Sequence, residues 1–165
     1  MKSADLSRAY VSWGSNLGDS ESLVADAIDR LIAIDGIFEV TCSPAYRSKA
    51  IGPGEQRDYH NGVVEIKTSL TPKSLLEVLH RIEASLGRER IVRWGARTVD
   101  LDLLDYEGFS SDVTELLIPH PRAHLRNFVI YPWADIAPNW RLHSQSIEQW
   151  RKETPDEDLS LWQDS

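Results

Sequence analysis

The order of strand-like and helix-like segments is the feature that most constrains how this chain can fold. Strand-forming residues dominate residues 8–15, 37–48, 60–68 and 98–106. Apolar side chains recur at helical spacing within residues 20–34 and 71–86. The order is therefore strand, helix, strand, strand, helix, strand, which is the split arrangement of a ferredoxin-like domain. We predict an α+β fold in which helices pack on one face of an antiparallel sheet, extended by extra C-terminal elements after residue 107.

Both helices carry start or stop signals. Thr71 followed by Pro72 suits a helix start, because threonine caps the first turn and proline is tolerated at the first helical position. Gly36 and Gly87 can supply the left-handed residue that ends a helix. Residues 49–59 contain two glycines and a proline and form a long loop of the kind that often carries function.

Length, charge and cysteine content narrow the class of protein. The 165 residues suit a single domain over residues 1–165, with an acidic tail from about residue 151 to 165. The net charge of -8 argues against a general nucleic-acid or anionic-membrane surface. The single cysteine, Cys42, excludes an internal disulfide, and its strand-like surroundings predict a buried structural thiol. No apolar run suits a membrane span or a signal peptide, so we expect a cytoplasmic chain.

The stretch GRERIVRWGARTVDLDLLDY, residues 87–106, combines fixed positive charge with paired carboxylates. Asp100 and Asp102 lie two apart on a predicted strand and therefore share one face, opposite the apolar residues between them. Such a pair suits Mg²⁺, which takes one or two carboxylates and completes its shell with waters and phosphates, although a solvated strand face gives the same pattern. The arginines before it bind phosphate well, although a solvated charged loop would also contain them. Together the two features favour a nucleotide-phosphate site, and the chain has no P-loop motif.

Two further residues in this region allow two interpretations each. Trp94 could stack on a planar ligand ring or pack against a neighbouring helix. Glu83 borders the apolar stripe of the second helix and is either an ordinary half-exposed glutamate or a contact of the site.

Sequence blocks in a fixed order resemble the 6-hydroxymethyl-7,8-dihydropterin pyrophosphokinase family of the folate pathway. They are GSNLGD at 14–19, YRSKAIGPGEQRDYHNGVV at 46–64, GRERIVRWGARTVDLDLL at 87–104 and IPHPRAHLRNFVIYPWADIAP at 118–138. The resemblance implies the ferredoxin-like fold. It also implies transfer of pyrophosphate from ATP to the hydroxymethyl oxygen of the pterin, with release of AMP and participation of two Mg²⁺ ions.

On the ATP side, the resemblance implies phosphate or metal contacts for Arg88, Arg90, Arg97, Asp100, Asp102, His120 and Arg126. Asp100 and Asp102 would bind both metals. Arg88 and Arg97 would contact the triphosphate or the transferring group and count with the two aspartates as catalytic. His120 would reach a phosphate oxygen, although it could instead cap a turn.

On the pterin side, the resemblance implies contacts from Ser48, Ile51, Tyr59, Asn61, Trp94 and Phe128. Asn61 offers an acceptor and donors to the amide-like edge of a pterin. Tyr59 and Phe128 would flank the ring, unless they are ordinary core aromatics. Backbone groups near Ser48 and Ile51 would complete the edge contacts.

The chain departs from the family pattern at Lys49, Ala50 and Ala96, where prolines are usual, and at Trp133, where leucine is commoner. None of these positions is a predicted metal ligand or phosphate arginine, so we expect the activity to be intact. The alternatives are an inactive nucleotide- or pterin-binding module and a nucleotidyltransferase with a paired-aspartate metal site. We expect a monomer that acts on ATP and 6-hydroxymethyl-7,8-dihydropterin, without nucleic-acid or membrane partners.

Overall fold

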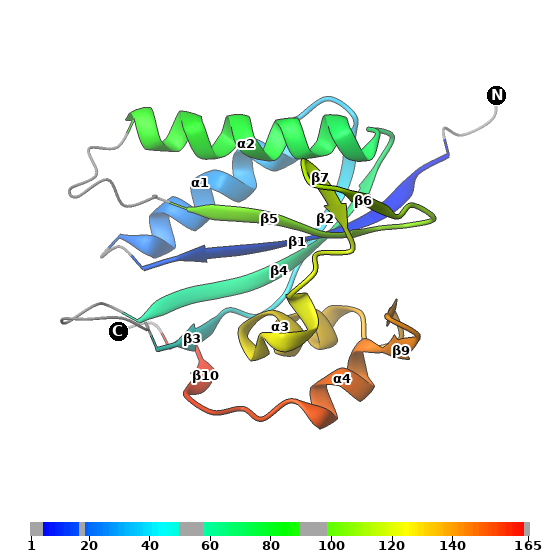
Figure 1. The fold of residues 1–165 in the computed structure, drawn as a ribbon. Helices are drawn as coiled ribbons and strands as arrows, with labels where there is room; N and C mark the ends of the chain where they lie inside the picture. Colours follow the sequence, from blue (N-terminus) through cyan, green and yellow to red (C-terminus); the bar gives the residue numbers. More distant parts are fainter. Residues whose placement is uncertain (1–4, 17–18, 50–57, 90–98, 164–165) are drawn as a thin grey trace.

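The computed structural model describes residues 5–16, 19–49, 58–89 and 99–163 (Figure 1). The side chains of Arg88 and Glu89, at the end of a helix, are not described. Of the predicted site residues, Ile51, Arg90, Trp94 and Arg97 lie outside the described residues.

Long and short strands form a six-stranded sheet. Five of them follow the order β10-β3-β4-β1-β5, and the sixth, β2, pairs with β4. The strands are β1 (Ser7–Ser15), β2 (Ile37–Cys42), β3 (Tyr46–Ser48), β4 (Tyr59–Thr68), β5 (Asp100–Tyr106) and β10 (Leu159–Leu161). Every pairing between them is antiparallel. With β2 and β3 counted as one interrupted strand, the first part of the chain has the order of a ferredoxin-like sheet. The predicted α+β fold with an antiparallel sheet is confirmed.

Helices cover both faces of this sheet (Figure 1). They are α1 (Ser20–Ile32), α2 (Pro72–Glu89), α3 (Asn127–Ile136) and α4 (Ile147–Glu153). Under α1 and α2 lies one core, which includes Val11 and Leu79, and under α3 lies a second core, which includes Tyr10 and Trp133. The expected C-terminal extension therefore buries the sheet face that α1 and α2 leave open. In the described part of the chain, no helix has the length and apolar character of a membrane span.

Short elements join these layers: β6 (Ser111–Val113), β7 (Leu116–Ile118), the 3-10 helix η2 (Ala123–Leu125), β8 (Arg141–Leu142) and β9 (Gln145–Ser146). β7 and η2 lead the chain from β5 to the start of α3. This path of the chain sets the positions of residues 118–138, the last of the four sequence blocks described above.

Of the three predicted helix signals, the one at Thr71 is correct, the one at Gly36 is correct in conformation, and the one at Gly87 is wrong. Thr71 caps α2, because its Oγ1 accepts a hydrogen bond from the backbone N–H of Ser74 at 3.1 Å. Gly36 has the predicted left-handed conformation, with a φ of 96°, but α1 already ends at Ile32, with Ala33 as its C-cap. Gly87 does not end α2, which continues to Glu89. Glycine in a helix costs only about 1 kcal/mol relative to alanine, and the buried Leu86 anchors that turn to the core.

The predicted strand over residues 37–48 is divided into β2 and β3 around Ser43 and Pro44. Proline has no N–H to donate to a sheet. Ser43 bridges the gap, because its backbone N–H donates to the Val63 carbonyl and its Oγ accepts from the Val63 N–H, both at 2.9 Å. The two short strands therefore follow one edge of β4 in succession.

The prediction of a buried Cys42 is wrong, because the thiol is exposed. Cys42 is the last residue of β2, and only Ile37 of that strand is buried. A side chain at the end of a short outer strand lacks the covering neighbours that a central strand has.

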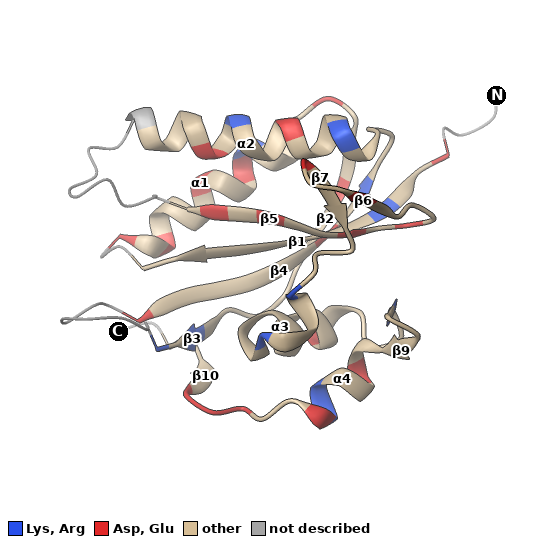
Figure 2. Ribbon diagram, in the orientation of Figure 1, with Lys and Arg blue, Asp and Glu red and all other residues tan. Residues whose placement is uncertain are grey.

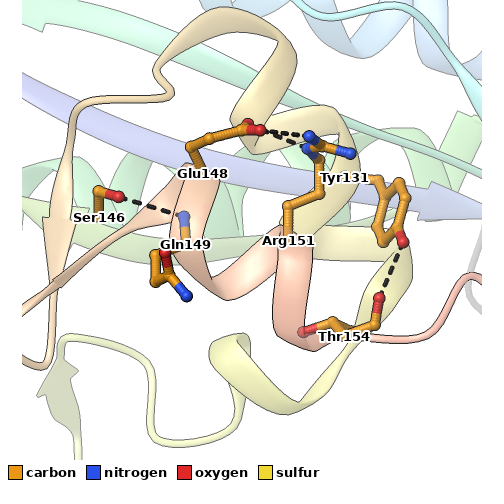
Figure 3. A network of polar contacts seen from close by, with 6 residues as sticks. All are labelled: Tyr131, Ser146, Glu148, Gln149, Arg151 and Thr154. Carbon is orange, nitrogen blue, oxygen red and sulfur yellow. Dashed lines mark hydrogen bonds and ion pairs between the residues drawn. The ribbon is translucent and has the colours of Figure 1, made fainter.

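Residues 139–163 are folded against the rest of the described chain. Ser146 caps α4 by accepting a hydrogen bond from the Gln149 N–H at 3.1 Å, and Glu148 pairs with Arg151 one turn later (Figure 3). The Tyr131 hydroxyl of α3 donates to the Thr154 carbonyl at 2.8 Å, which ties the end of α4 to α3. The acidic tail then continues into β10, whose pairing with β3 the sequence did not indicate.

Candidate active site

The pairing register places the predicted metal and pterin residues on one face of the sheet. Asp100 of β5 pairs with Gly14 of β1, and Gly14 pairs in turn with Asn61 of β4. Residues in register on neighbouring strands point to the same face. Asp100 and Asn61 therefore lie on one face, separated by a residue that has no side chain. This is the face that α3 covers further along the strands.

Asp102 belongs to the next row on the same face, opposite Ser12. Both aspartates are half-buried, whereas Leu101 and Leu103 point into the core under α1 and α2 with 6% and 5% exposure. The predicted alternation along β5 is confirmed. Figure 2 shows acidic positions along β5. Among the described residues, no lysine or arginine forms an ion pair with Asp102.

This pair of carboxylates fits Mg²⁺ by the chemistry of its oxygen donors. Within the described residues, no cluster of three or more histidine, cysteine, aspartate or glutamate side chains could hold a metal ion. A hard cation held by Asp100 and Asp102 would thus need water and phosphate oxygens to complete its shell. Mg²⁺ is commonly bound in this way in phosphoryl-transfer sites.

Asp105, the third aspartate of the strand, is kept apart from this pair. The register between β1 and β5 shifts between Tyr10 and Val11. Asp105 is buried beside the second core, where its carboxylate accepts hydrogen bonds from the Trp140 indole and the Tyr106 N–H, both at 2.9 Å. Burial raises the pKa of Asp105, and these two hydrogen bonds oppose the shift. Both of its carboxylate oxygens are thus hydrogen-bonded within the protein.

His120 lies beside the aspartates because its backbone N–H donates to the Leu104 carbonyl of β5 at 2.7 Å. Burial lowers the pKa of His120; the negative charge of Asp102 opposes this shift, and Arg126 and Arg122 add to it. Burial thus favours the neutral form of the imidazole. Its Nδ1 accepts a hydrogen bond from the Arg122 N–H at 3.1 Å, which places the ring proton on Nε2.

The His120 hydrogen bond to the Arg122 N–H is the turn-capping contact that the sequence left open. It does not use Nε2, so the same ring can also donate to a phosphate oxygen. Arg122 is a residue that sequence reasoning missed, although it belongs to the quoted PHPR motif. The structure brings its positive charge, together with that of Arg126, within electrostatic reach of His120.

Asn61 has a fixed orientation on the pterin side. It is 4% exposed, and its Nδ2 donates to Ser48 Oγ at 2.8 Å and to the Tyr59 carbonyl at 3.2 Å. Both amide N–H groups are thus used within the protein. The carbonyl Oδ1 lies over Gly14, where an added Cβ would stand 3.4 Å away. Asn61 therefore offers a ligand an acceptor, and not the donors that the sequence analysis also expected.

Tyr59 and Phe128 are both half-buried rather than enclosed in a core. Tyr59 begins β4 and pairs with Ser48 across the strands. Phe128, in the first turn of α3, packs at the margin of the second core, and the Arg126 guanidinium carbon lies 5.9 Å from its ring centroid. Each ring has one side in the protein and one part exposed, as a residue flanking a ligand would.

Glu83 contacts the strand that carries the aspartates. Its Oε2 accepts a hydrogen bond at 2.9 Å from the backbone N–H of Leu101, the residue between Asp100 and Asp102. Among the strands that the structure describes, β5 is the outermost on this side, so this N–H has no partner in a further described strand. Glu83 thus supplies the missing acceptor and fixes α2 against β5.

A hollow of about 270 Å³ lies elsewhere, between the start of β1 and the segment after α3. Arg8, Tyr10, Glu65 and Trp140 are among the residues that line it. Gly14 and the aspartate row lie toward the other end of β1, so this hollow is separate from the site.

The arrangement of an aspartate pair, a neutral histidine and an oriented asparagine agrees with a comparison against known families. A sequence model described as 7,8-dihydro-6-hydroxymethylpterin-pyrophosphokinase (HPPK) matches residues 10–138. The chain belongs to the HPPK family. The HPPK match includes every described residue of the site and ends before α4 and β10.

Individual relatives support the HPPK assignment. A 2-amino-4-hydroxy-6-hydroxymethyldihydropteridine pyrophosphokinase from Methylorubrum extorquens is 41% identical over 144 residues, which cover 87% of this chain and 91% of the relative. A protein of the same name from Bacillus subtilis is 38% identical over 154 residues, covering 93% of this chain and 89% of the relative. The crystal structure of wild-type HPPK-DHPS from Plasmodium falciparum with pterin and p-hydroxybenzoate superposes with a TM-score of 0.69 at 13% identity. That match covers 93% of this chain but 44% of the longer one, and it shows the shared fold.

Proposed function

We propose that this chain is an ATP-dependent pyrophosphokinase that acts on 6-hydroxymethyl-7,8-dihydropterin in folate biosynthesis. The hydroxymethyl oxygen attacks the β-phosphorus of ATP and loses its proton, and the bond from that phosphorus to the α,β-bridging oxygen breaks. The products are the pyrophosphorylated pterin and AMP. The observation that carries the proposal is the alignment of Asp100, Asp102 and Asn61 on one sheet face, with His120 beside them.

Asp100 and Asp102 are the metal ligands in this proposal. Two Mg²⁺ ions, when bound, supply positive charge to the phosphate oxygens and lower the pKa of the attacking hydroxyl. The half-buried position of both aspartates and their shared face of β5 support this role. The cores on both sides of the sheet hold β5 rigid, so the two carboxylates keep their spacing.

His120 donates from Nε2 to a phosphate oxygen of ATP, and Arg126 adds positive charge nearby. A neutral imidazole can act as a hydrogen-bond donor here because the Arg122 N–H occupies Nδ1. Phosphoryl transfer needs little covalent work from the protein, so the rate depends on positioning and on charge stabilisation. The contributions of Arg88, Arg90 and Arg97 to the same task remain predictions from the family resemblance.

Asn61 selects the pterin by accepting an N–H of its amide-like edge. Its Oδ1 is held in place because Ser48 and Tyr59 engage both of its donors. Tyr59 and Phe128 flank the ring. The contacts proposed for Ile51 and Trp94 rest on the family resemblance alone.

The deciding experiment is incubation of the purified chain with Mg²⁺, ATP and 6-hydroxymethyl-7,8-dihydropterin, followed by separation of the nucleotides. We expect AMP to form in equal amount with the pyrophosphorylated pterin. Release of free pyrophosphate would instead support the nucleotidyltransferase alternative, and ATP binding without AMP would support an inactive binding module.

We also propose that the chain acts as a monomer in the cytoplasm. The negative net charge and the acidic pI of about 5.1 keep such a chain dispersed in neutral solution. Light scattering on the eluate of a size-exclusion column measures the mass directly, and a value near 18.7 kDa is the expected result.

A further inference from the structure

The segment after α4 reaches back to the strands that carry the pterin residues, although it lies beyond the HPPK match. β10 pairs with β3 in antiparallel register, with Leu159 opposite Ser48 and Leu161 opposite Tyr46. Lys49, directly after β3, forms an ion pair of 3.6 Å with Asp158. Figure 1 shows β10 lying along β3 at the margin of the sheet. The last part of the chain thus forms the outer border of the pterin side.

Trp162 is the side chain that fastens this segment. Its ring stacks on the His60 imidazole, with centroids 4.0 Å apart and an interplanar angle of 28°. The Arg47 guanidinium carbon lies 4.4 Å from the centroid of the Trp162 ring. The indole Nε1 donates to Glu21 Oε1 at 2.9 Å. One residue therefore contacts β3, β4 and the first turn of α1.

These contacts lie directly behind the pterin residues. His60 and Arg47 are cross-strand partners, and the neighbouring residues Asn61 and Ser48 point to the opposite face of the same two strands. β3 contains only three residues, so its position depends on both of its edges. β4 holds one edge, and β10 holds the other.

A shift of β3 would have a specific chemical result. Ser48 Oγ is the acceptor that orients the Asn61 amide, and the Tyr59 carbonyl is the other. If β3 moves away from β4, Asn61 loses the partner that keeps its Oδ1 toward the ligand side. The ATP residues on β5 lie three strands away from β3, beyond β4 and β1, and would not be affected directly.

We propose that Trp162 is a positioning residue for pterin recognition: it fastens β10 to β3 and β4 and so keeps Ser48 and Asn61 aligned. The proposal rests on the pterin-binding role given to Asn61 above. It assigns a function to a segment that the family match does not include.

The test compares Trp162→Ala, Trp162→Phe and the matched control Leu161→Ala with the unmodified chain. Leu161 is the last residue of β10 and directly precedes Trp162, but it is 56% exposed. Calorimetry measures the Kd of 6-hydroxymethyl-7,8-dihydropterin in the presence of Mg²⁺ and α,β-methylene-ATP, an analogue with the scissile linkage blocked. For each protein we also measure the hydrogen-exchange rate of the peptide that contains Tyr46–Ser48 and the KM for each substrate.

We expect Trp162→Ala to weaken pterin binding by about two- to tenfold, the range that loss of one aromatic pair gives, with an unchanged KM for ATP. Exchange in β3 should become faster in the same variant. Trp162→Phe should restore most of both properties because it retains the stacked ring, and Leu161→Ala should behave as the unmodified chain.

Unchanged pterin affinity and β3 exchange in folded Trp162→Ala would overturn the proposal. So would an equal rise in KM for both substrates, since that indicates general destabilisation. The exchange measurement does not depend on turnover. If the unmodified chain released no AMP, the proposed function would fail, while the link between Trp162 and β3 would still be tested.

Discussion

Asp100 and Asp102 show how much a pairing register decides at the level of single residues. The aspartate-leucine-aspartate spacing places both carboxylates on one face, but only the pairing with β1 and β4 brings Asn61 onto the same face. Gly14 between Asp100 and Asn61 leaves open the space in which a side chain would otherwise stand. The residues proposed to bind the metal and the pterin thus share a surface because the register aligns them.

Asp102→Asn should remove most turnover without unfolding the chain. The carboxamide keeps the volume but loses the charge that holds a hard cation. We expect kcat to fall by at least about 100-fold, because even groups that merely support metal ligands are worth about 10- to 100-fold. The exposed Asp112 offers the same substitution as a control, and it should leave kcat unchanged. A folded Asp102→Asn protein with near-normal AMP release would contradict the metal assignment.

His120 should make the stability of the chain depend on pH. Burial lowers its pKa below the ordinary 6.5, so the unfolded chain takes up this proton at a higher pH than the folded chain does. The stability is therefore complete above the unfolded pKa and declines as the pH falls through it toward the folded value. Urea unfolding between about pH 7.5 and about pH 5.5 measures this decline.

In His120→Gln the decline in unfolding free energy over the same pH range should be smaller. The other histidines remain in the variant, so the difference between the two proteins isolates His120. Equal declines would show that this imidazole has the same proton affinity in the folded and unfolded chains.

At the level of elements, a hydrogen bond joins α2 to the part of β5 that carries the aspartate pair. Glu83 of α2 accepts from the Leu101 N–H, so the position of the helix and that of the aspartate pair are linked. Sequence reasoning placed Glu83 at the border of an apolar stripe but could not pair it with a strand N–H, because that pairing depends on how α2 packs.

Glu83→Ala should destabilise the chain by about 1–3 kcal/mol, the usual result of leaving a partly buried N–H without its acceptor. Denaturant unfolding measures this change. Glu83→Gln retains an acceptor oxygen and should recover most of the stability. Glu77→Ala, on the exposed side of the same helix, serves as the control. Equal stability of the Glu83→Ala and Glu77→Ala proteins would mean that water replaces the lost acceptor.

Sequence patterns predicted the helices and strands correctly where these elements are long and their apolar residues are periodic. They succeeded for α1, α2, β1, β4 and β5, and the Thr71 cap was also correct. They failed where distant packing decides the outcome. Gly87 stays helical because Leu86 is buried, and β10 forms because β3 offers an open edge. For the same reason the Asn61–Ser48 hydrogen bond, which orients the amide, could not be predicted from the sequence.

For the whole molecule, the two cores on opposite faces of one sheet are the main source of rigidity. Tyr10 and Val11 are neighbours on β1, yet they belong to different cores. We therefore expect a change in the packing of the core under α3 to alter the stability of the strands that carry the candidate site. This core also includes residues of the last third of the chain, beyond the predicted ferredoxin-like arrangement.

Ile147→Ala tests this dependence. Ile147 begins α4 and is completely buried in the core under α3. The substitution should lower the free energy of unfolding by about 2–5 kcal/mol, as other large-to-small core changes do. Lys152→Ala, on the exposed side of α4, is the control and should have little effect. If Ile147→Ala changed only local exchange near α4, the two cores would be independent.

β10 also covers the edge of the sheet at which a strand from another copy of the chain could add. A bare sheet margin presents unpaired backbone groups and can template the addition of strands from another molecule, which is a route to aggregation. With β10 in place, that margin is a strand of three residues, flanked by the Lys49–Asp158 ion pair. Short, charged borders discourage such addition. We therefore expect the strand that is proposed to hold the pterin side in place also to disfavour the addition of another strand at this margin.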